Sequence, residues 1–404
     1  MIVPYVLTAL VYTGCDAWVE DVEPPRDEIV DALLTDESQV DFLIKGIESR
    51  FATSYTRVAL YASGLSDELI YSPDNDRAVF AFEPPIDVGD PGFDNVFVSE
   101  MHADIGELRY LADQLLFRMG RIEFADQNLK ARADFAGRFY GGVARYFLGT
   151  YFGLTQHEGG GVITEDPESP GPFIPAPEMY RLALNKLDEA KAFADAPQVR
   201  LINTLVARIN LFEGRYDDAR AAASIGLQMG DPAFESLHAN DFTAVNRFWS
   251  QAGPGNYGWT FDPVFHDFVV SDPNEANRIP MTELTTERDD SVHVFYGQDR
   301  YRDRSSPHPF ATWQENELML AELDLRDGNG GGALTRINAV RASHGIDPLE
   351  TANMSSVELE RRKELWSLGL RLPDQRRFNS WHLEDGTWVY FPIPRAERDI
   401  NPNL

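Results

Sequence analysis

The chain has 404 residues, 43% of them hydrophobic, which is long enough for one large domain or two moderate ones. Its formal net charge of −29 argues against a nucleic-acid partner, because phosphate binding needs clustered lysines and arginines. Only five of its 36 basic residues are lysines. An acidic, lysine-poor composition suits either a high-salt habitat or a genome that favours arginine codons, and composition alone leaves both open.

The N-terminus has the features of an exported lipoprotein. Residues 1–14 (MIVPYVLTALVYTG) are apolar and too short to span a bilayer as a helix, but they suit the core of an export signal. Thr13-Gly14-Cys15 resembles the end of a bacterial lipoprotein signal, in which the cysteine becomes the lipidated first residue. Residues 15–28 are acidic and contain two prolines, which predicts a solvated tether. We expect residues 29–404 to form a single domain.

Helical periodicity covers most of the first half of that domain. Residues 29–60 predict one or two helices, with Phe42, Ile44 and Ile47 facing inward. Further helices are expected at 100–119, 129–152 and 177–195, the second unusually aromatic and predicted to lie in the core. Between the predicted helical regions 29–60 and 100–119, residues 61–98 are rich in Ser, Asp, Gly and Pro and have no helical period. Loops of this length are more often functional than idle.

A helical hairpin is predicted between residues 200 and 230. Leu201, Leu205 and Ile209 recur at a helical spacing, and Gly214 interrupts the pattern where a tight turn needs positive φ. An alanine-rich helix follows and is expected to end near Gly230. This order is typical of a tetratricopeptide-type hairpin, which must pack against helical neighbours to bury its apolar stripe.

A second long excursion occupies residues 234–309. It has no helical period, and its dense aromatic side chains are punctuated by Gly and Pro, so we predict little regular structure there. A second helix–glycine–helix unit follows at 312–326 and 333–343, and then a charged helix at 357–370. The alternating charges at the end of this helix predict ion pairs that dock the C-terminal tail. These charged residues are Glu360, Arg361, Glu364, Arg371 and Asp374.

The sequence contains no recognisable catalytic constellation. Its eight histidines and single cysteine have no metal-ligand spacing, and no nucleophile elbow, P-loop or dinucleotide fingerprint occurs, so no metal or cofactor is predicted. A glycosidase would need two carboxylates placed across a cleft, which sequence cannot show. We therefore predict a non-catalytic, mainly all-α protein built from tetratricopeptide-like hairpins with two loop-rich excursions.

Several segments, in this order, resemble the SusD/RagB family. They are Cys15 with its acidic follow-on, Ser66-Asp67-Glu68 ahead of a long loop, the aromatic helix ARADFAGRFYGGVARYFLGTYFG, the hairpins around Gly214 and Gly328, and the C-terminal segments ELERRKELWSLGLRLPDQRRF and PIPRAERDINPNL. The resemblance implies a lipid-anchored outer-membrane protein facing the cell exterior. Such a protein captures an oligosaccharide and passes it to a partner TonB-dependent (SusC-like) transporter.

The resemblance also implies a ligand site built from the two excursions. Sugar rings present apolar C–H faces, so an aromatic platform flanked by polar side chains suits them. The candidates are Asp74, Asn75, Asp76 and Arg77 from the first excursion, and Trp249, Tyr257, Trp259, Tyr296 and Tyr301 from the second. Two alternatives to oligosaccharide binding remain. One is a peptide ligand, taken either by a member of the same family or by a tetratricopeptide-type scaffold, and the other is a cell-surface glycoside hydrolase.

Overall fold

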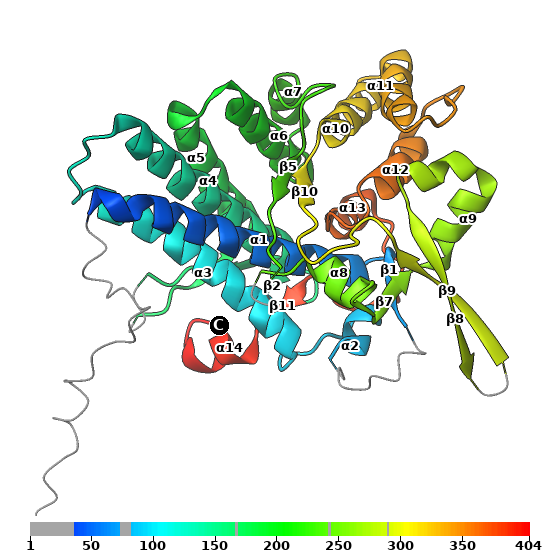
Figure 1. Ribbon diagram of the computed structural model, residues 1–404, viewed down its shortest axis with the longest axis horizontal. Coiled ribbons are helices and arrows are strands. Elements are labelled where there is room, and N and C mark those ends of the chain that lie inside the picture. Colours follow the sequence, from blue (N-terminus) through cyan, green and yellow to red (C-terminus); the bar gives the residue numbers. More distant parts are fainter. Residues whose placement is uncertain (1–35, 73–81, 166–168, 241–243, 289–290) are drawn as a thin grey trace, which may run out of the picture.

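The computed structural model describes residues 36–72, 82–165, 169–240, 244–288 and 291–404 (Figure 1). The predicted signal, Cys15, the acidic tether, and Asp74, Asn75, Asp76 and Arg77 lie outside these ranges. Three long helices form the body of the N-terminal half: α1 (Val40–Leu65), α3 (Val96–Met119) and α4 (Gln127–Tyr151). They run side by side, and α5 (Ala176–Ala190) packs on α4.

Close packing of these helices depends on glycines within the aromatic segment. A Cβ on Gly137 of α4 would lie 2.6 Å from Leu116 Cγ of α3, and one on Gly142 would lie 3.0 Å from Leu187 Cγ of α5. The predicted aromatic core is confirmed, because Phe139 and Phe147 are fully buried. The prediction for Phe42 is wrong, since its side chain is 60% exposed near the start of α1.

Both predicted hairpins are present. The first consists of α6 (Ala196–Phe212) and α7 (Tyr216–Ala223), and the second of α10 (Trp313–Arg326) and α11 (Gly330–Ser343). Gly214 and Gly328 turn the chain with φ of 70° and 77°. α7 ends earlier than expected, seven residues before Gly230. The two units share an apolar cluster of Ala207, Leu211, Ala219, Ala222, Ala223, Met319, Leu320 and Leu323. The mainly helical fold is therefore as predicted.

The excursions contain more regular structure than predicted, and the expectation for residues 234–309 is wrong. In the first, α1 continues to Leu65, β1 (Leu69–Tyr71) follows, and α2 spans Pro84–Asp87. The elements of the second are β5 (Phe234–Ser236), α8 (Arg247–Ala252), β6 (Asn256–Tyr257), β7 (Trp259–Phe261), α9 (Pro263–Ser271), β8 (Met281–Arg288), β9 (Ser291–Gln298) and β10 (His308–Ala311). Antiparallel β8 and β9 form a hairpin that projects from the body (Figure 1).

Short strand pairs connect segments that are distant in the sequence. β1 pairs with β7, which joins the two excursions, and β5 pairs with β10. β11 (Phe391–Pro392) pairs in parallel with β2 (Phe152–Gly153), and β3 (Gly160–Val162) pairs with β4 (Phe173–Pro175). Among the described residues, none of the helices has the length and apolarity needed to cross a bilayer.

The predicted C-terminal ion pairs are confirmed. Arg361 of α12 (Met354–Glu364) pairs with Asp374 of α13 (Arg371–Phe378) at 2.8 Å. Arg371 reaches Asp67 beyond the end of α1 at 2.7 Å, so the pairs dock the C-terminal segment onto the N-terminal half. The charged helix ends at Glu364 rather than near residue 370, because Ser367 and Gly369 adopt positive φ. The chain then runs through α14 (Arg395–Ile400).

Candidate ligand-binding site

Two of the predicted site residues belong to the hydrophobic core, which corrects their assignment. Trp259 is completely buried: its ring fills the space above Gly64 of α1, and its indole N–H donates to Glu83 Oε1 at 3.1 Å. Tyr301 is 1% exposed, and its hydroxyl lies 2.9 Å from Ser367 Oγ. Neither ring presents a face to solvent, so neither can stack on a ligand in this structure.

Trp249, Tyr257 and Tyr296 are partly exposed and remain candidates. The Trp249 ring lies against Gly255, where a Cβ would come within 2.9 Å of it, and the Arg304 guanidinium lies 5.0 Å from its centroid. Tyr257 packs on Gly297 of β9. Because Gly255 and Gly297 have no side chain, the rings of Trp249 and Tyr257 can pack directly against the backbone at these positions.

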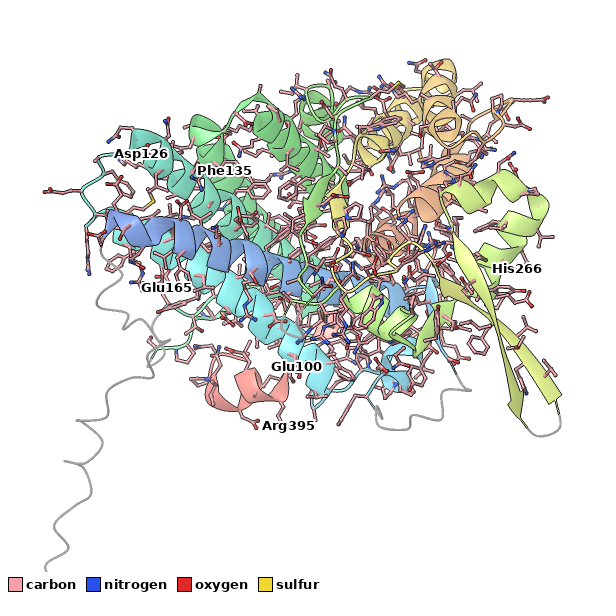
Figure 2. The ribbon with its side chains drawn as sticks, in the orientation of Figure 1. Glu100, Asp126, Phe135, Glu165, His266 and Arg395 are labelled. Atoms are coloured by element: carbon pink, nitrogen blue, oxygen red, sulfur yellow. The ribbon has the colours of Figure 1, made fainter. Side chains whose placement is uncertain are left out.

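Tyr296 lies on the opposite side of the β8–β9 hairpin from Tyr257. Because successive side chains of a strand point to opposite faces, Tyr296 and its neighbour Gly297 present opposite sides of the β8–β9 hairpin. Tyr296 stacks on His266 of α9, with ring centroids 4.0 Å apart and an interplanar angle of 9°. Figure 2 shows His266 on α9, close to the hairpin. Tyr257 and Tyr296 thus do not share one binding surface.

Three aromatic rings not singled out from the sequence are connected through ring contacts and a hydrogen bond to α8, which carries Trp249, and to β7, which follows Tyr257. Phe82 is 41% exposed and packs edge-on against Phe97 at 6.4 Å. Phe97 of α3 stacks on Tyr61 of α1, and the Tyr61 hydroxyl lies 3.4 Å from the Gln251 side chain of α8. Tyr61 therefore connects α3 with the helix that carries Trp249. Tyr71 lies edge-on to Trp259 at 5.6 Å. We define the aromatic face as five residues: Tyr71, Phe82, Phe97, Trp249 and Tyr257.

The β1–β7 pairing explains how distant segments build this face. Tyr71 pairs with Trp259, and an isolated bridge joins Tyr257 to Ala252 at the end of α8. Phe82 and Phe97 flank α2, which contacts both β1 and α1. The only signal in the sequence was that these rings lie in or near the predicted 61–98 excursion. Single aromatics without a period do not reveal which of them are exposed.

Carboxyl groups with raised pKa lie beneath and beside the aromatic face. Burial raises the pKa of Glu83 to about 7, and the hydrogen bond from Trp259 offsets only part of that effect. Burial also raises the pKa of Asp87 to about 6, opposed by a backbone hydrogen bond from Tyr71 and supported by the nearby Asp262 carboxylate. Glu83 is 2% exposed and already bound to Trp259, so it serves as a support for the face rather than as a contact for ligand.

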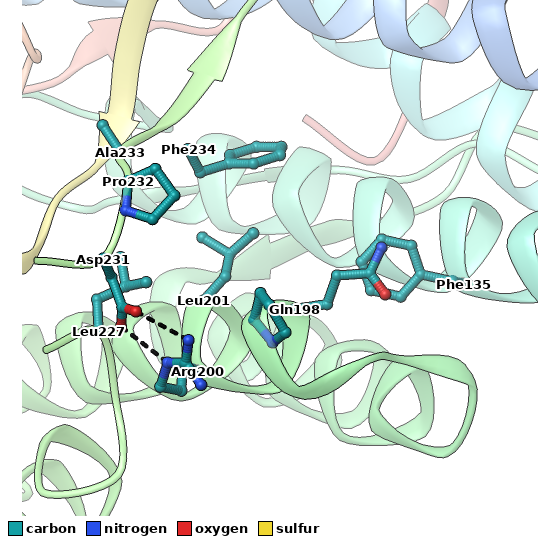
Figure 3. A pocket seen from close by; sticks show the side chains of 10 residues that line it. Phe135, Gln198, Arg200, Leu201, Leu227, Asp231, Pro232, Ala233 and Phe234 are labelled. Atoms are coloured by element: carbon teal, nitrogen blue, oxygen red, sulfur yellow. Dashed lines mark hydrogen bonds and ion pairs between the residues drawn. The ribbon is translucent and has the colours of Figure 1, made fainter.

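A separate, apolar cavity of about 190 Å³ lies between α4 and α6 (Figure 3). Phe135, Leu201 and Phe234 supply much of its lining. Arg200 and Asp231 form a bidentate ion pair at the edge of the cavity, with both hydrogen bonds at 2.8 Å. Because these polar groups already satisfy each other, the cavity suits a small apolar group better than a hydroxyl-rich one.

No protein-family model and no curated protein matches the sequence. Solved structures do match its fold. A SusD superfamily protein from Bacteroides vulgatus superposes with a TM-score of 0.71 at 13% identity, covering 91% of this chain and 98% of the other. A laminarin binding SusD-like protein gives 0.69 at 14% identity, with coverages of 91% and 98%. A SusD-like carbohydrate binding protein from Bacteroides vulgatus gives 0.65 at 13% identity, with coverages of 91% and 97%. The chain therefore has the SusD-like fold.

Proposed function

We propose that this protein is a non-catalytic, cell-surface binding protein that captures an oligosaccharide at the aromatic face. The observation that carries the proposal is the position of this face, at the junction of the two excursions within a SusD-like fold. Trp249, Tyr257 and Phe82 offer ring surface for sugar C–H faces, and the Arg304 guanidinium beside Trp249 carries hydrogen-bond donors. Two structural neighbours, described as laminarin binding and carbohydrate binding, support this ligand class.

Delivery and anchoring complete the proposal. Cys15 would carry the lipid that holds the protein at the outer membrane, facing the exterior, and a TonB-dependent, SusC-like transporter would receive the ligand. The lipoprotein-like N-terminal sequence supports the first step. Metabolic labelling with a fatty-acid analogue, compared between the wild type and Cys15→Ser, tests it directly. Co-purification with such a transporter from native membranes tests the second step.

Ligand capture is tested by a glycan and peptide binding screen on protein beginning at Asp16, with Trp249→Ala in parallel. Loss of one stacking ring should weaken glycan binding about tenfold to a hundredfold, by analogy with base stacking on aromatics. Phe117→Ala is the matched control, because Phe117 is 56% exposed on α3 and is no part of the aromatic face. Binding that survives Trp249→Ala unchanged would remove this face from the site.

A peptide ligand is the second candidate. The apolar cavity beside α6 has room for a hydrophobic side chain and lies next to the first helical hairpin, where tetratricopeptide-type scaffolds bind peptides. Peptide binding without glycan binding in the same screen would favour this function. The third alternative, glycoside hydrolysis, requires turnover of labelled glycans, and we expect none.

A further inference from the structure

A second pocket of mixed polarity lies beside the turn of the first helical hairpin. Its volume is about 470 Å³, within the range of about 300–1,000 Å³ that is typical of small-molecule sites. The start of α5, the end of α6, the middle of α13 and the segment around Tyr390 enclose it. It shares no residue with the aromatic face or with the apolar cavity.

Rigid backbone shapes this pocket. Three prolines line it, Pro175 and Pro177 at the start of α5 and Pro373 in α13, and proline fixes its own backbone φ. Tyr390 lies directly against Gly159, where a Cβ would come within 2.5 Å of the ring. Tyr180 is buried, and its hydroxyl lies 3.1 Å from Thr150 Oγ1. These walls are therefore preorganised rather than dependent on mobile side chains.

The cationic groups of the pocket are held in place by the protein. Arg376 donates to the backbone carbonyls of Val389 at 2.8 Å and Thr150 at 2.6 Å, and its guanidinium lies 4.1 Å from the Tyr390 ring centroid. It takes part in none of the ion pairs formed among the described residues. Arg377, in contrast, is neutralised by Asp374 and Glu322 at 2.7 and 2.6 Å. The pocket thus keeps one cation without a carboxylate partner.

Two carboxylates oppose this cation. Glu213, at the end of α6, and Glu158, in the loop after α4, both line the pocket. Glu213 is paired with Arg215 at 2.5 Å. An anionic ligand would meet these carboxylates as well as the overall charge of −29, and a cationic ligand would meet Arg376. Because Arg215 already pairs with Glu213, and Asp374 and Glu322 with Arg377, the charges that face a ligand are mainly Arg376 and the exposed Glu158 carboxylate, one of each sign. These two charges offset each other, so a neutral ligand suits the pocket.

We propose that this pocket binds a neutral saccharide unit, as a second sugar site separate from the aromatic face. Sugar hydroxyls both donate and accept, so they can satisfy the Arg376 guanidinium and the Glu213 carboxylate at the same time. The C–H face of the ring has apolar partners in Phe212, Ala176 and the three prolines. A long glycan that engaged both sites would gain avidity without new contacts at either one.

The test is calorimetric titration of the full chain with neutral glucose, galactose, mannose, xylose, maltose and laminaribiose, beside glucuronic acid and glucosamine. Ala176→Trp places a large ring in the pocket, and Arg181→Trp adds the same ring at an exposed position of α5 outside it. We expect at least one neutral sugar to bind at a site that Ala176→Trp weakens at least tenfold. Arg181→Trp and Trp249→Ala should leave that site unchanged.

Glu213→Gln provides a second variant that adds no bulk. Glu213→Gln should weaken sugar binding at this pocket several-fold. If Ala176→Trp lowers the unfolding midpoint, the result with Glu213→Gln decides whether the pocket binds sugar. The proposal is overturned if no neutral sugar binds, if binding is indifferent to both pocket variants, or if glucuronic acid or glucosamine binds more tightly than the neutral sugars. Loss of binding in Trp249→Ala alone would support the aromatic face and overturn the second site.

Discussion

The indole N–H of Trp259 donates a hydrogen bond to the buried carboxyl of Glu83, across 3.1 Å in space and 176 positions in sequence. Trp259 lies in β7 and Glu83 immediately precedes α2, so this contact ties the two loop-rich segments together under the aromatic face. Because Glu83 is a carboxyl held in a buried site, its protonation couples the stability of this region to pH.

The pH dependence of stability should change when Glu83 is replaced by Gln. The folded-state pKa of about 7 lies above the ordinary value of 4.5, so the carboxyl stabilises the fold fully below pH 4.5 and loses that contribution as pH rises through 7. Glu83→Gln keeps an oxygen acceptor for Trp259. Between pH 5 and pH 8 the variant should gain about 2.5 kcal/mol relative to the wild type, since one pKa unit corresponds to about 1.4 kcal/mol.

Urea unfolding at several pH values measures this difference. Glu384→Gln, at an exposed position, is the control and should track the wild type throughout. If the curves for Glu83→Gln and the wild type run parallel from pH 5 to pH 8, the carboxyl does not titrate as the structure indicates.

Trp259→Ala should mainly reduce stability, whereas Trp249→Ala should mainly reduce glycan binding. Trp259 is fully buried, so its removal leaves a cavity and should cost about 3–5 kcal/mol of stability. Trp249 is partly exposed, so its removal should cost far less stability but should impair glycan binding. Unfolding curves and ligand titrations on both variants separate the two effects. A stable Trp259→Ala variant with impaired binding would return that residue to the ligand site.

The C-terminal ion pairs should contribute substantially to stability. Asp374 accepts hydrogen bonds from Arg361 and Arg377, both largely buried, and these arginines hold its pKa below the ordinary value. Asp374→Ala leaves two guanidinium groups without this partner in the interior, which should cost about 3–5 kcal/mol. Glu178→Ala removes an exposed pair with Arg181 and should cost far less stability, because solvent screens the two charges. Equal losses in the two variants would contradict a structural role for the buried pairs.

Salt should stabilise the protein if its acidic surface reflects a high-salt habitat. The net charge of −29 produces self-repulsion, which dissolved ions screen. Under this hypothesis the thermal unfolding midpoint rises continuously from low to molar KCl. A midpoint that stays constant over that range would favour the alternative explanation, a genome that prefers arginine codons.

Local sequence signals were sufficient to predict the helical hairpins and the presence of ion pairs near the C-terminus. Around Gly214, a helical period on both sides and a glycine between them define the turn without reference to the rest of the chain. The alternating charges from Glu360 to Asp374 predicted that ion pairs form, and Arg361 does pair locally with Asp374. Other partners are distant, since Glu360 pairs with Arg278 and Arg371 with Asp67, and the local sequence did not reveal them.

The exposure of the candidate site residues depends on interactions that are not local, which is why the sequence did not reveal that Trp259 and Tyr301 are buried. Trp249 and Trp259 have the same side chain and lie ten positions apart, yet one is partly exposed and the other is fully buried. The difference arises because β7 pairs with β1 and places Trp259 over Gly64. The β8–β9 hairpin was also missed, although each strand has eight residues. The alternation of Val292, Val294 and Tyr296 in β9 was the signal for it.

The pairing of β1 with β7 also bears on the order in which the protein folds. Leu69 contacts Phe261 only after the intervening chain has returned, so closing this loop carries a larger entropic cost than forming either helical hairpin. Contacts of such long sequence separation form slowly, whereas neighbouring helices associate early. The helical body should therefore assemble first and the aromatic face last. The surface proposed to bind ligand would therefore be completed only when folding is nearly finished.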